Sequence, residues 1–412
     1  MATRRRKPST PKGSSKSKPG APAKSTRNTP TRFAHPFYTT TPLATRATGP
    51  HGKQLLTHIQ GNLNPVPKPR GNASMALADI IGQASSAAIE HTKELKFHAV
   101  GDTGRHADSP QGLVAAAMTK DYTISQPEKC PAFFLHLGDV IYGPNKIQRY
   151  RPEFYEPYVH YPGKIIAIPG NHDGEIFPKT DPRTLEGFQA NFCASRAVVP
   201  PIAGTIFRET MTQPGVYWFL DAPFVQVIGL YSNAAENPGF ISGGAAGTDQ
   251  RDWLVATLKS ITAARKKGPR KALVIASHHP PFTSGGHSPS TGMLADIDTA
   301  CAQGGVLPDM FLSGHAHSYQ RYTRFVPQGQ RTLEIPYIVA GTGGISDQAI
   351  AAANNQRTGD HTFVKSRKGY GYLLITAEAG RLTAAFTAVD DVTGKSTPYD
   401  RVVVDLAKGT VS

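Results

Sequence analysis

The sequence predicts a layered α/β fold, a sheet with helices packed outside it. Three observations support this class. Short apolar runs of strand type recur between residues 95 and 390, a helical pattern separates the first two, and five runs lead into short polar motifs. Because loops at the carboxyl ends of strands carry the chemistry in such folds, we expect these motifs to meet at one edge.

The expected elements follow from apolar spacing. Residues 75–91 favour a helix, and residues 113–118 favour another between the first two strands. Residues 176–215 match no element, and residues 232–247, rich in Gly and Asn, are expected to form a surface loop. A further helix is expected to begin at Thr248 or Asp249. Strands are expected at 95–100, 133–137, 164–168, 215–220, 224–230, 271–277, 310–313, 335–340, 372–376 and 382–388.

Charge divides the chain into a basic tail and a nearly neutral remainder. Residues 1–70 contain 14 Lys or Arg, 11 Pro and no Asp or Glu, whereas residues 71–412 contain 31 basic and 30 acidic residues. A segment with so few apolar residues cannot offset the entropy of ordering. We therefore expect a disordered tail over 1–70, a connecting helix over 71–92 and one domain over 93–407.

Composition also limits location and partners. The basic run Arg4–Lys7 suits contact with nucleic acid, anionic lipid or another polyanion, although a solvated extension is the plainer interpretation. No apolar stretch reaches membrane-spanning length, and no apolar run follows the basic start as a secretory signal requires, which favours the cytoplasm. Three widely spaced cysteines exclude a disulfide framework and a Cys-based zinc site. The sequence does not indicate an oligomeric state.

Five polar motifs follow the predicted strands and supply carboxylate, amide, phenol and imidazole groups. An oxygen-rich set with three imidazoles suits two hard or borderline metal ions. Two metal ions held close together are a recurring device for hydrolysing phosphate esters. A single Gly-Asp pair is better explained as a turn, but five such motifs in order are not. The motifs are Gly101-Asp102-Thr103-Gly104, Gly138-Asp139-Val140-Ile141-Tyr142, Gly170-Asn171-His172-Asp173, Ile275-Ala276-Ser277-His278 and Gly314-His315-Ala316-His317.

The order and spacing of these motifs resemble the calcineurin-like metallophosphoesterases over roughly residues 95–390. The Gly-Asp-x-x-Tyr form of the second motif makes the purple acid phosphatases the most similar group. The resemblance implies a four-layer α/β/β/α sandwich and a centre of two metal ions, iron with a second iron, zinc or manganese. The implied ligands are Asp102, Tyr142 and His317 for the first metal, Asp139 as a bridge, and Asn171, His278 and His315 for the second.

Two further histidines are candidate catalytic residues. His172 adjoins Asn171 and is the first candidate to bind the phosphate oxygens or to protonate the leaving group. His287 lies nine residues after His278, a spacing at which the family places a histidine, and is a proton donor or an orienting group.

A structural role without contact to metal or substrate is an alternative interpretation for several of these residues. Tyr142 could pack with its hydroxyl hydrogen-bonded, and His172 could pack behind the ligands without touching substrate. Asp173 either orients His172 or ends the turn. Strand positions indicate structural roles for His98, His136 and His279, and a surface loop is expected for His106 and Asp108.

The expected function is hydrolysis of phosphate esters by a metal-bound hydroxide, with acid phosphatase activity on monoesters as the first choice. One alternative is a phosphodiesterase that uses the same metals, for example on cyclic nucleotides. An alternative of another class is a protein that docks on nucleic acid or membrane through its basic tail. The intact set of seven ligands argues against that last alternative.

Overall fold

The computed structural model describes residues 66–177, 180–181, 183–243 and 246–412. The tail predicted over residues 1–70 therefore lies outside the described residues, except for its last five. None of the described helices is long and apolar enough to cross a membrane. The three cysteines are free, as the sequence predicts.

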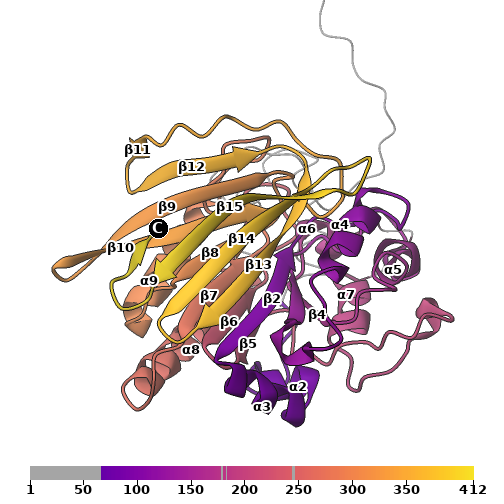
Figure 1. Cartoon of the computed structure of the whole chain (residues 1–412), viewed down its shortest axis with the longest axis horizontal. Helices are drawn as coiled ribbons and strands as arrows, with labels where there is room; N and C mark the ends of the chain where they lie inside the picture. The colour runs from indigo at the N-terminus through magenta and orange to yellow at the C-terminus, as the bar shows by residue number, and fades with distance from the viewer. Residues whose placement is uncertain (1–65, 178–179, 182, 244–245) are drawn as a thin grey trace, which may run out of the picture. The chain divides into compact units, whose positions relative to one another are not determined.

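Two sheets form the centre of the described chain (Figure 1). One has nine strands in the order β1-β5-β6-β7-β8-β10-β9-β12-β11, and the other has seven in the order β16-β15-β14-β13-β2-β3-β4. The strands are β1 (Ser74–Ala76), β2 (Glu94–Val100), β3 (Pro131–His136), β4 (Lys164–Ala167), β5 (Trp218–Asp221), β6 (Val225–Leu230), β7 (Ala272–Ser277), β8 (Met310–Ser313), β9 (Tyr319–Gln328), β10 (Arg331–Ala340), β11 (Arg357–Thr358), β12 (His361–Arg367), β13 (Tyr370–Glu378), β14 (Arg381–Val389), β15 (Ser396–Asp405) and β16 (Thr410–Val411).

Helices pack on the outer face of each sheet. The longest, α8 and α9, lie against the nine-stranded sheet, and α4 lies against the seven-stranded sheet (Figure 1). The helices are α2 (Leu77–Ile81), α3 (Gln83–Thr92), α4 (Pro110–Thr119), α5 (Lys146–Tyr150), α6 (Asn171–Gly174), α7 (Glu186–Phe192), α8 (Asp249–Arg265) and α9 (Thr291–Gly304), with short helical turns at η2 (Pro127–Lys129), η3 (Arg151–Tyr155) and η4 (Pro201–Ala203).

Alternation along single strands builds the layers. In β7, Ala272, Val274 and Ala276 join the apolar cluster between the two sheets, whereas Leu273 and Ile275 join the cluster under α8 and α9. A third cluster packs α4 and the segment from α5 to η3 on the seven-stranded sheet. Two outer helical layers and two inner sheets confirm the predicted α/β/β/α sandwich.

The predicted connecting helix over 71–92 is not a single helix. Residues 74–76 form β1, which pairs with β5, and residues 77–92 divide into α2 and α3 at Gly82, where φ is 86°. Glycine adopts this left-handed backbone conformation without steric cost. The segment is thus part of the nine-stranded sheet and its surroundings rather than a connector.

The end of the predicted tail also belongs to the fold. Val66 is buried in the cluster under α4. The Arg70 guanidinium donates hydrogen bonds at 2.7–3.2 Å to four backbone carbonyl oxygens, those of Cys193, Ala194, Thr212 and Gln213. The described fold therefore includes residues that charge composition alone assigns to the tail.

The segment predicted as a surface loop at 232–247 is largely buried over its described residues 232–243, 246 and 247. Ser232, Asn233, Asn237 and Phe240 are each at most 2% exposed. Small and amide side chains suit close packing as well as they suit solvent, so composition does not separate these cases. This segment lies beside the candidate site.

Candidate metal centre

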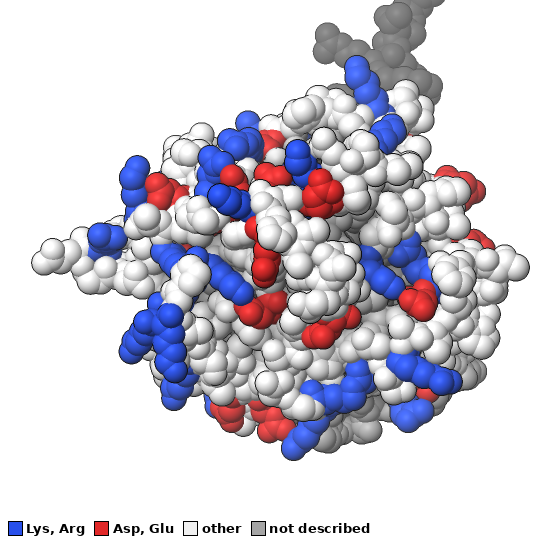
Figure 2. Space-filling model, turned by 60° about the horizontal axis from the view of Figure 1, so that its bottom comes forward, with Lys and Arg blue, Asp and Glu red and all other residues white. Residues whose placement is uncertain are grey.

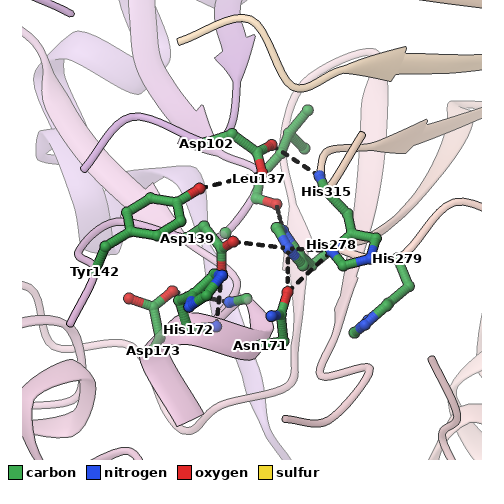
Figure 3. Close-up of polar contacts among 12 residues, drawn as sticks. Asp102, Leu137, Asp139, Tyr142, Asn171, His172, Asp173, His278, His279 and His315 are labelled. Atoms are coloured by element: carbon green, nitrogen blue, oxygen red, sulfur yellow. Dashed lines mark hydrogen bonds and ion pairs between the residues drawn. The ribbon is translucent and has the colours of Figure 1, made fainter. Parts of the chain in front are cut away.

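All five motif loops meet at one edge of the two sheets. The motifs follow β2, β3 and β4, which are parallel in one sheet, and β7 and β8, which are parallel in the other. The Gly101 N–H donates to the Ala340 carbonyl at 3.0 Å, and this hydrogen bond joins the end of β2 to the end of β10. The carboxyl ends of strands from both sheets thus surround one cluster of polar side chains (Figure 3).

Three of the predicted ligands have left-handed backbone conformations. The φ angles are 60° at Asp102, 54° at Asp139 and 68° at His315. Residues with a Cβ atom rarely adopt such angles, and strain of this kind is concentrated at functional sites. The backbone here is bent to bring these side chains into the cluster.

Motif glycines are required by close approach to the ligands. A Cβ atom on Gly104 would lie 2.0 Å from Cδ2 of the Tyr142 ring, and one on Gly170 would lie 2.1 Å from Oδ1 of Asp139. Both distances are far below van der Waals contact. Glycine at these positions therefore leaves room for the ligand of a neighbouring loop.

Asn171, His278 and His315 bring one atom each to a common point. Asn171 Oδ1 lies 3.0 Å from His278 Nε2 and 2.9 Å from His315 Nδ1, and the two ring nitrogens are 3.3 Å apart. All three residues are at most 2% exposed. Asp139 joins them, with Oδ2 lying 3.3 Å from His278 Nε2.

Hydrogen bonds behind these three side chains fix which atoms face one another. His278 Nδ1 contacts the Leu137 carbonyl at 2.9 Å, and His315 Nε2 lies 3.4 Å from Asn237 Oδ1. An imidazole that donates from one nitrogen presents a lone pair on the other. The Asn171 amide nitrogen faces a Glu236 carboxylate oxygen at 3.4 Å, which turns its oxygen toward the cluster.

Three acceptor lone pairs that converge in a buried space fit a cation. Burial opposes charge on His278, but the Asp139 and Asp102 carboxylates outweigh it and raise its pKa to about 9. Surroundings that stabilise a proton on His278 would also stabilise a metal cation in its place. Asp139, His278 and His315 have ligand atoms close enough together to share one ion.

A second group of predicted ligands lies around Asp102. Asp102 Oδ1 is 3.5 Å from the Tyr142 hydroxyl and 3.5 Å from His317 Nε2. His317 Nδ1 contacts the Ser346 carbonyl at 2.8 Å, so its Nε2 presents the lone pair. Burial, together with the nearby Asp139 and Asp102 carboxylates, raises the pKa of the Tyr142 hydroxyl well above its usual value. Asp139 therefore lies between Tyr142 of this group and His278 of the other, as a bridging carboxylate would (Figure 3).

His172 is held from two sides. Its backbone N–H donates to Asp139 Oδ1 at 2.8 Å, and its Nδ1 lies 2.8 Å from Glu175 Oε2. Its ring centroid is 4.4 Å from that of Tyr142. Burial opposes protonation of the ring, but the Asp139 and Glu175 carboxylates outweigh it and raise the pKa of His172.

His287 lies on the other side of the cluster, with its ring centroid 4.0 Å from that of His315. Its Nε2 is 2.9 Å from the amide nitrogen of Gln348, and its Nδ1 is 3.3 Å from the amide nitrogen of Asn237. Amide nitrogens only donate, so every proton on the ring faces another donor: a neutral ring has one such contact and a doubly protonated ring has two. Burial, with the nearby His317 and His278, lowers the pKa of His287 to about 3.

Asp173 neither orients the His172 ring nor ends a turn. Its buried carboxylate accepts hydrogen bonds from the backbone N–H groups of Gly170, Val140 and Ile141, at 2.8–3.4 Å. It therefore starts α6 and ties the loop of Asn171 to the loop of Asp139. The side chain that contacts the His172 ring is Glu175.

The remaining polar residues lie where the sequence indicates. His98, His136 and His279 are fully buried, and His279 contacts Ser232 and the Ala235 carbonyl. His106 and Asp108 form a hydrogen-bonded pair of side chains, 58% and 90% exposed.

Sequence reasoning missed the residues that orient the candidate ligands. They are distant in sequence from the ligands they contact, and only the spacing of Glu175, three residues after His172 across a helical turn, gave a local signal. The missed residues are Glu175, Glu236, Asn237, Ser346 and Gln348.

The chain belongs to the calcineurin-like phosphoesterase family, whose sequence profile matches residues 95–319. It is similar to purple acid phosphatase 21 of Arabidopsis thaliana, with 24% identity over 212 residues, which are 51% of this chain and 43% of that protein. The matched part thus spans less than half of that relative.

Two solved structures share 11–13% identity with the chain. One is GAP50, described as the anchor in the inner membrane complex of Plasmodium, with 11% identity, a TM-score of 0.48 and coverage of 74% of this chain and 88% of that one. The other is PhoD, with 13% identity, a TM-score of 0.49 and coverage of 77% and 71%.

The members of this family are metal-dependent hydrolases of phosphate esters. The superfamily typically binds two metal ions, and the structure contains a candidate site for metal among the described residues.

Proposed function

We propose that this protein is an acid phosphatase that hydrolyses phosphate monoesters with two metal ions, iron together with iron, zinc or manganese. The observation that carries the proposal is the pair of ligand groups around Asp102 and Asn171, with Asp139 between them. Support for the monoesterase class comes from Tyr142, whose phenolate would suit a ferric ion, and from the similarity to a purple acid phosphatase.

The proposed ligands are those predicted from the sequence. When bound, the two metal ions would neutralise phosphate charge and lower the pKa of water. Asn171 contributes a neutral oxygen, so the second metal would keep more of its positive charge than with a carboxylate. The protein supplies the fixed geometry, because each proposed imidazole ligand is oriented by an oxygen acceptor behind it.

We assign His172 as the group that binds the ester oxygens or protonates the leaving group. It adjoins both ligand groups and has a carboxylate partner for Nδ1. His287 is assigned as an orienting group, because amide nitrogens face both of its ring nitrogens. The structure thus favours one of the two roles that the sequence allowed for His287.

The test of this function is hydrolysis of a chromogenic monoester beside the matching diester, from acid to neutral pH, with metal content measured on the same sample. Monoester preference at acid pH with iron bound is expected. Diester preference near neutral pH with manganese or zinc would identify a phosphodiesterase instead. A protein that neither binds metal nor hydrolyses either ester would refute the proposal that this chain is an enzyme.

The two histidines should differ when replaced. His172→Ala is expected to lower kcat by about a hundredfold or more on an alkyl phosphate and by less on p-nitrophenyl phosphate, whose leaving group needs no proton. His287→Ala should lower kcat on the alkyl phosphate and on p-nitrophenyl phosphate by the same factor. Steady-state kinetics with metal content held constant would measure this. A larger loss on the alkyl ester for His287→Ala would instead assign protonation of the leaving group to His287 and the orienting role to His172.

Contact with a polyanion remains a proposal for the basic tail. On the face drawn in Figure 2, basic and acidic side chains are interspersed. Residues 71–412 are also nearly balanced in charge, whereas residues 1–70 have no acidic residue. A mixed surface gives no strong single-sign field, so the tail is the better candidate for such contact.

Truncation at two positions would distinguish the role of the tail from that of the catalytic domain. A chain that starts at residue 66 should keep full phosphatase activity and lose retention on heparin. A chain that starts at residue 71 should also unfold at a lower temperature, because it lacks the four hydrogen bonds of Arg70. Arg70→Ala in the full chain is the control for that second effect. Loss of phosphatase activity in the chain that starts at residue 66 would show that the tail contributes to catalysis.

A further inference from the structure

A buried lysine lies behind the candidate catalytic histidine. Lys146, the first residue of α5, is 5% exposed, and among the described residues its Nζ has no hydrogen-bond partner. Its backbone N–H donates to Asp181 Oδ1 at 2.8 Å, which fixes the start of the helix. A lysine is seldom buried this deeply unless its charge is compensated.

The compensating group is Glu175. Lys146 Nζ lies 3.7 Å from Glu175 Oε2, and Glu175 is 1% exposed. Two opposite charges this close in a buried space attract one another far more than at the surface. Burial lowers the pKa of Lys146, whereas the carboxylates of Glu175, Asp173 and Asp181 oppose this change. The pair is therefore a buried ion pair.

The same carboxylate oxygen connects the lysine to the candidate site. Glu175 Oε2 lies 2.8 Å from His172 Nδ1, so one oxygen contacts both the cation and the imidazole. Lys146 also lies over the Phe177 ring, at 5.4 Å from the centroid. Lysine, glutamate and histidine thus form a continuous chain of contacts, buried at Lys146 and Glu175, that ends with His172 beside Asp139 and Tyr142.

We propose that Lys146 is a positioning residue for His172. It keeps the Glu175 carboxylate in the place where that carboxylate fixes the ring orientation and the Nδ1–H tautomer of His172. The inference rests on the proposed phosphatase function, because it gives His172 a task in turnover. It extends that function by adding two residues, Lys146 and Glu175, that touch neither metal nor substrate.

A double-mutant comparison distinguishes positioning from a purely structural role. Lys146→Met keeps the length of the side chain and removes its charge, which leaves Glu175 buried without this partner. This variant should unfold at a lower temperature. The double variant Lys146→Met with Glu175→Gln should regain most of the lost temperature, because neither buried charge remains.

Activity should not follow stability in this comparison. We expect Lys146→Met, Glu175→Gln and the double variant each to keep two metal ions and the wild-type KM. Their kcat on an alkyl phosphate should be about tenfold or more below that of the wild type. Lys164→Met, which removes a half-exposed lysine paired with Glu209, is the matched control and should leave kcat unchanged. Recovery of kcat together with thermal stability in the double variant would show a structural role and overturn the proposal.

A measurement without turnover keeps this inference separate from the proposed function. In zinc-loaded protein labelled with ¹⁵N in its histidine rings, His172→Gln identifies the signals of His172. The Nδ1 signal should be that of a protonated nitrogen in the wild type and should shift in Lys146→Met. An unchanged signal overturns the proposal, whatever the hydrolysis assays show. The wild type could hydrolyse neither the phosphate monoester nor the diester while the Nδ1 signal of His172 shifts in Lys146→Met. In that case the phosphatase function would be refuted and the positioning role of Lys146 would remain.

Discussion

Asp139→Asn is expected to remove both metal ions and to lower phosphatase activity on the order of a thousandfold or more. Asp139 is the proposed ligand that lies between the two groups, with Oδ2 at 3.3 Å from His278 Nε2 and with Tyr142 on its other side (Figure 3). A bridging carboxylate supplies lone pairs and charge to two cations at once. An amide keeps the shape and loses the charge, so repulsion between two cations would no longer be offset.

Asparagine is the better substitution because of the backbone. Asp139 has φ of 54°, which Asn tolerates and Ala does not, so Asp139→Ala would combine the loss of the ligand with strain. Elemental analysis of the purified variant, beside its rate on a monoester, measures the effect. Asp108→Asn, at an exposed carboxylate after the first motif, is the control and should change neither. Two metals and a wild-type rate in Asp139→Asn would rule out the bridge.

Local sequence was sufficient to predict that the five polar motifs lie at the carboxyl ends of strands. Each motif directly follows an apolar strand, so the position of Asp102 or His278 depends only on where that strand ends and on the edge to which parallel strands bring their carboxyl ends. The four-layer arrangement came from the family resemblance, and alternation along strands such as β7 is consistent with it.

Residues that orient the ligands could not be predicted, because their contacts join distant parts of the chain. Asn237 lies in a segment whose Gly and Asn content matches a solvent loop, yet it is 1% exposed and contacts both His315 and His287. Lys146 appears in sequence as an ordinary lysine. Only the folded arrangement shows that it lies behind Glu175. The helix predicted over residues 71–92 is interrupted at Gly82, and its start is not helical because residues 74–76 pair with the distant strand β5.

Asp173→Ala is expected to lower the free energy of unfolding by about 2–3 kcal/mol. The Asp173 carboxylate, 2% exposed, accepts from the backbone N–H groups of Gly170, Val140 and Ile141. Alanine would leave these donors without the carboxylate in a buried place. Urea unfolding would measure the change. Asp173→Asn keeps one acceptor oxygen and should lose roughly half as much.

The metal centre should weaken together with the fold, because Asp173 joins two ligand loops. Gly170 precedes Asn171, and Val140 follows Asp139, so loss of the carboxylate would free these ligands to move apart. We expect Asp173→Ala to lose metal to a chelator faster than wild type at a temperature where both are folded. Asp390→Ala is the matched control, because Asp390 also accepts from two backbone N–H groups, but in an exposed turn where water replaces it. A stable Asp173→Ala variant that retains metal would mean that the loops are held in place without this carboxylate.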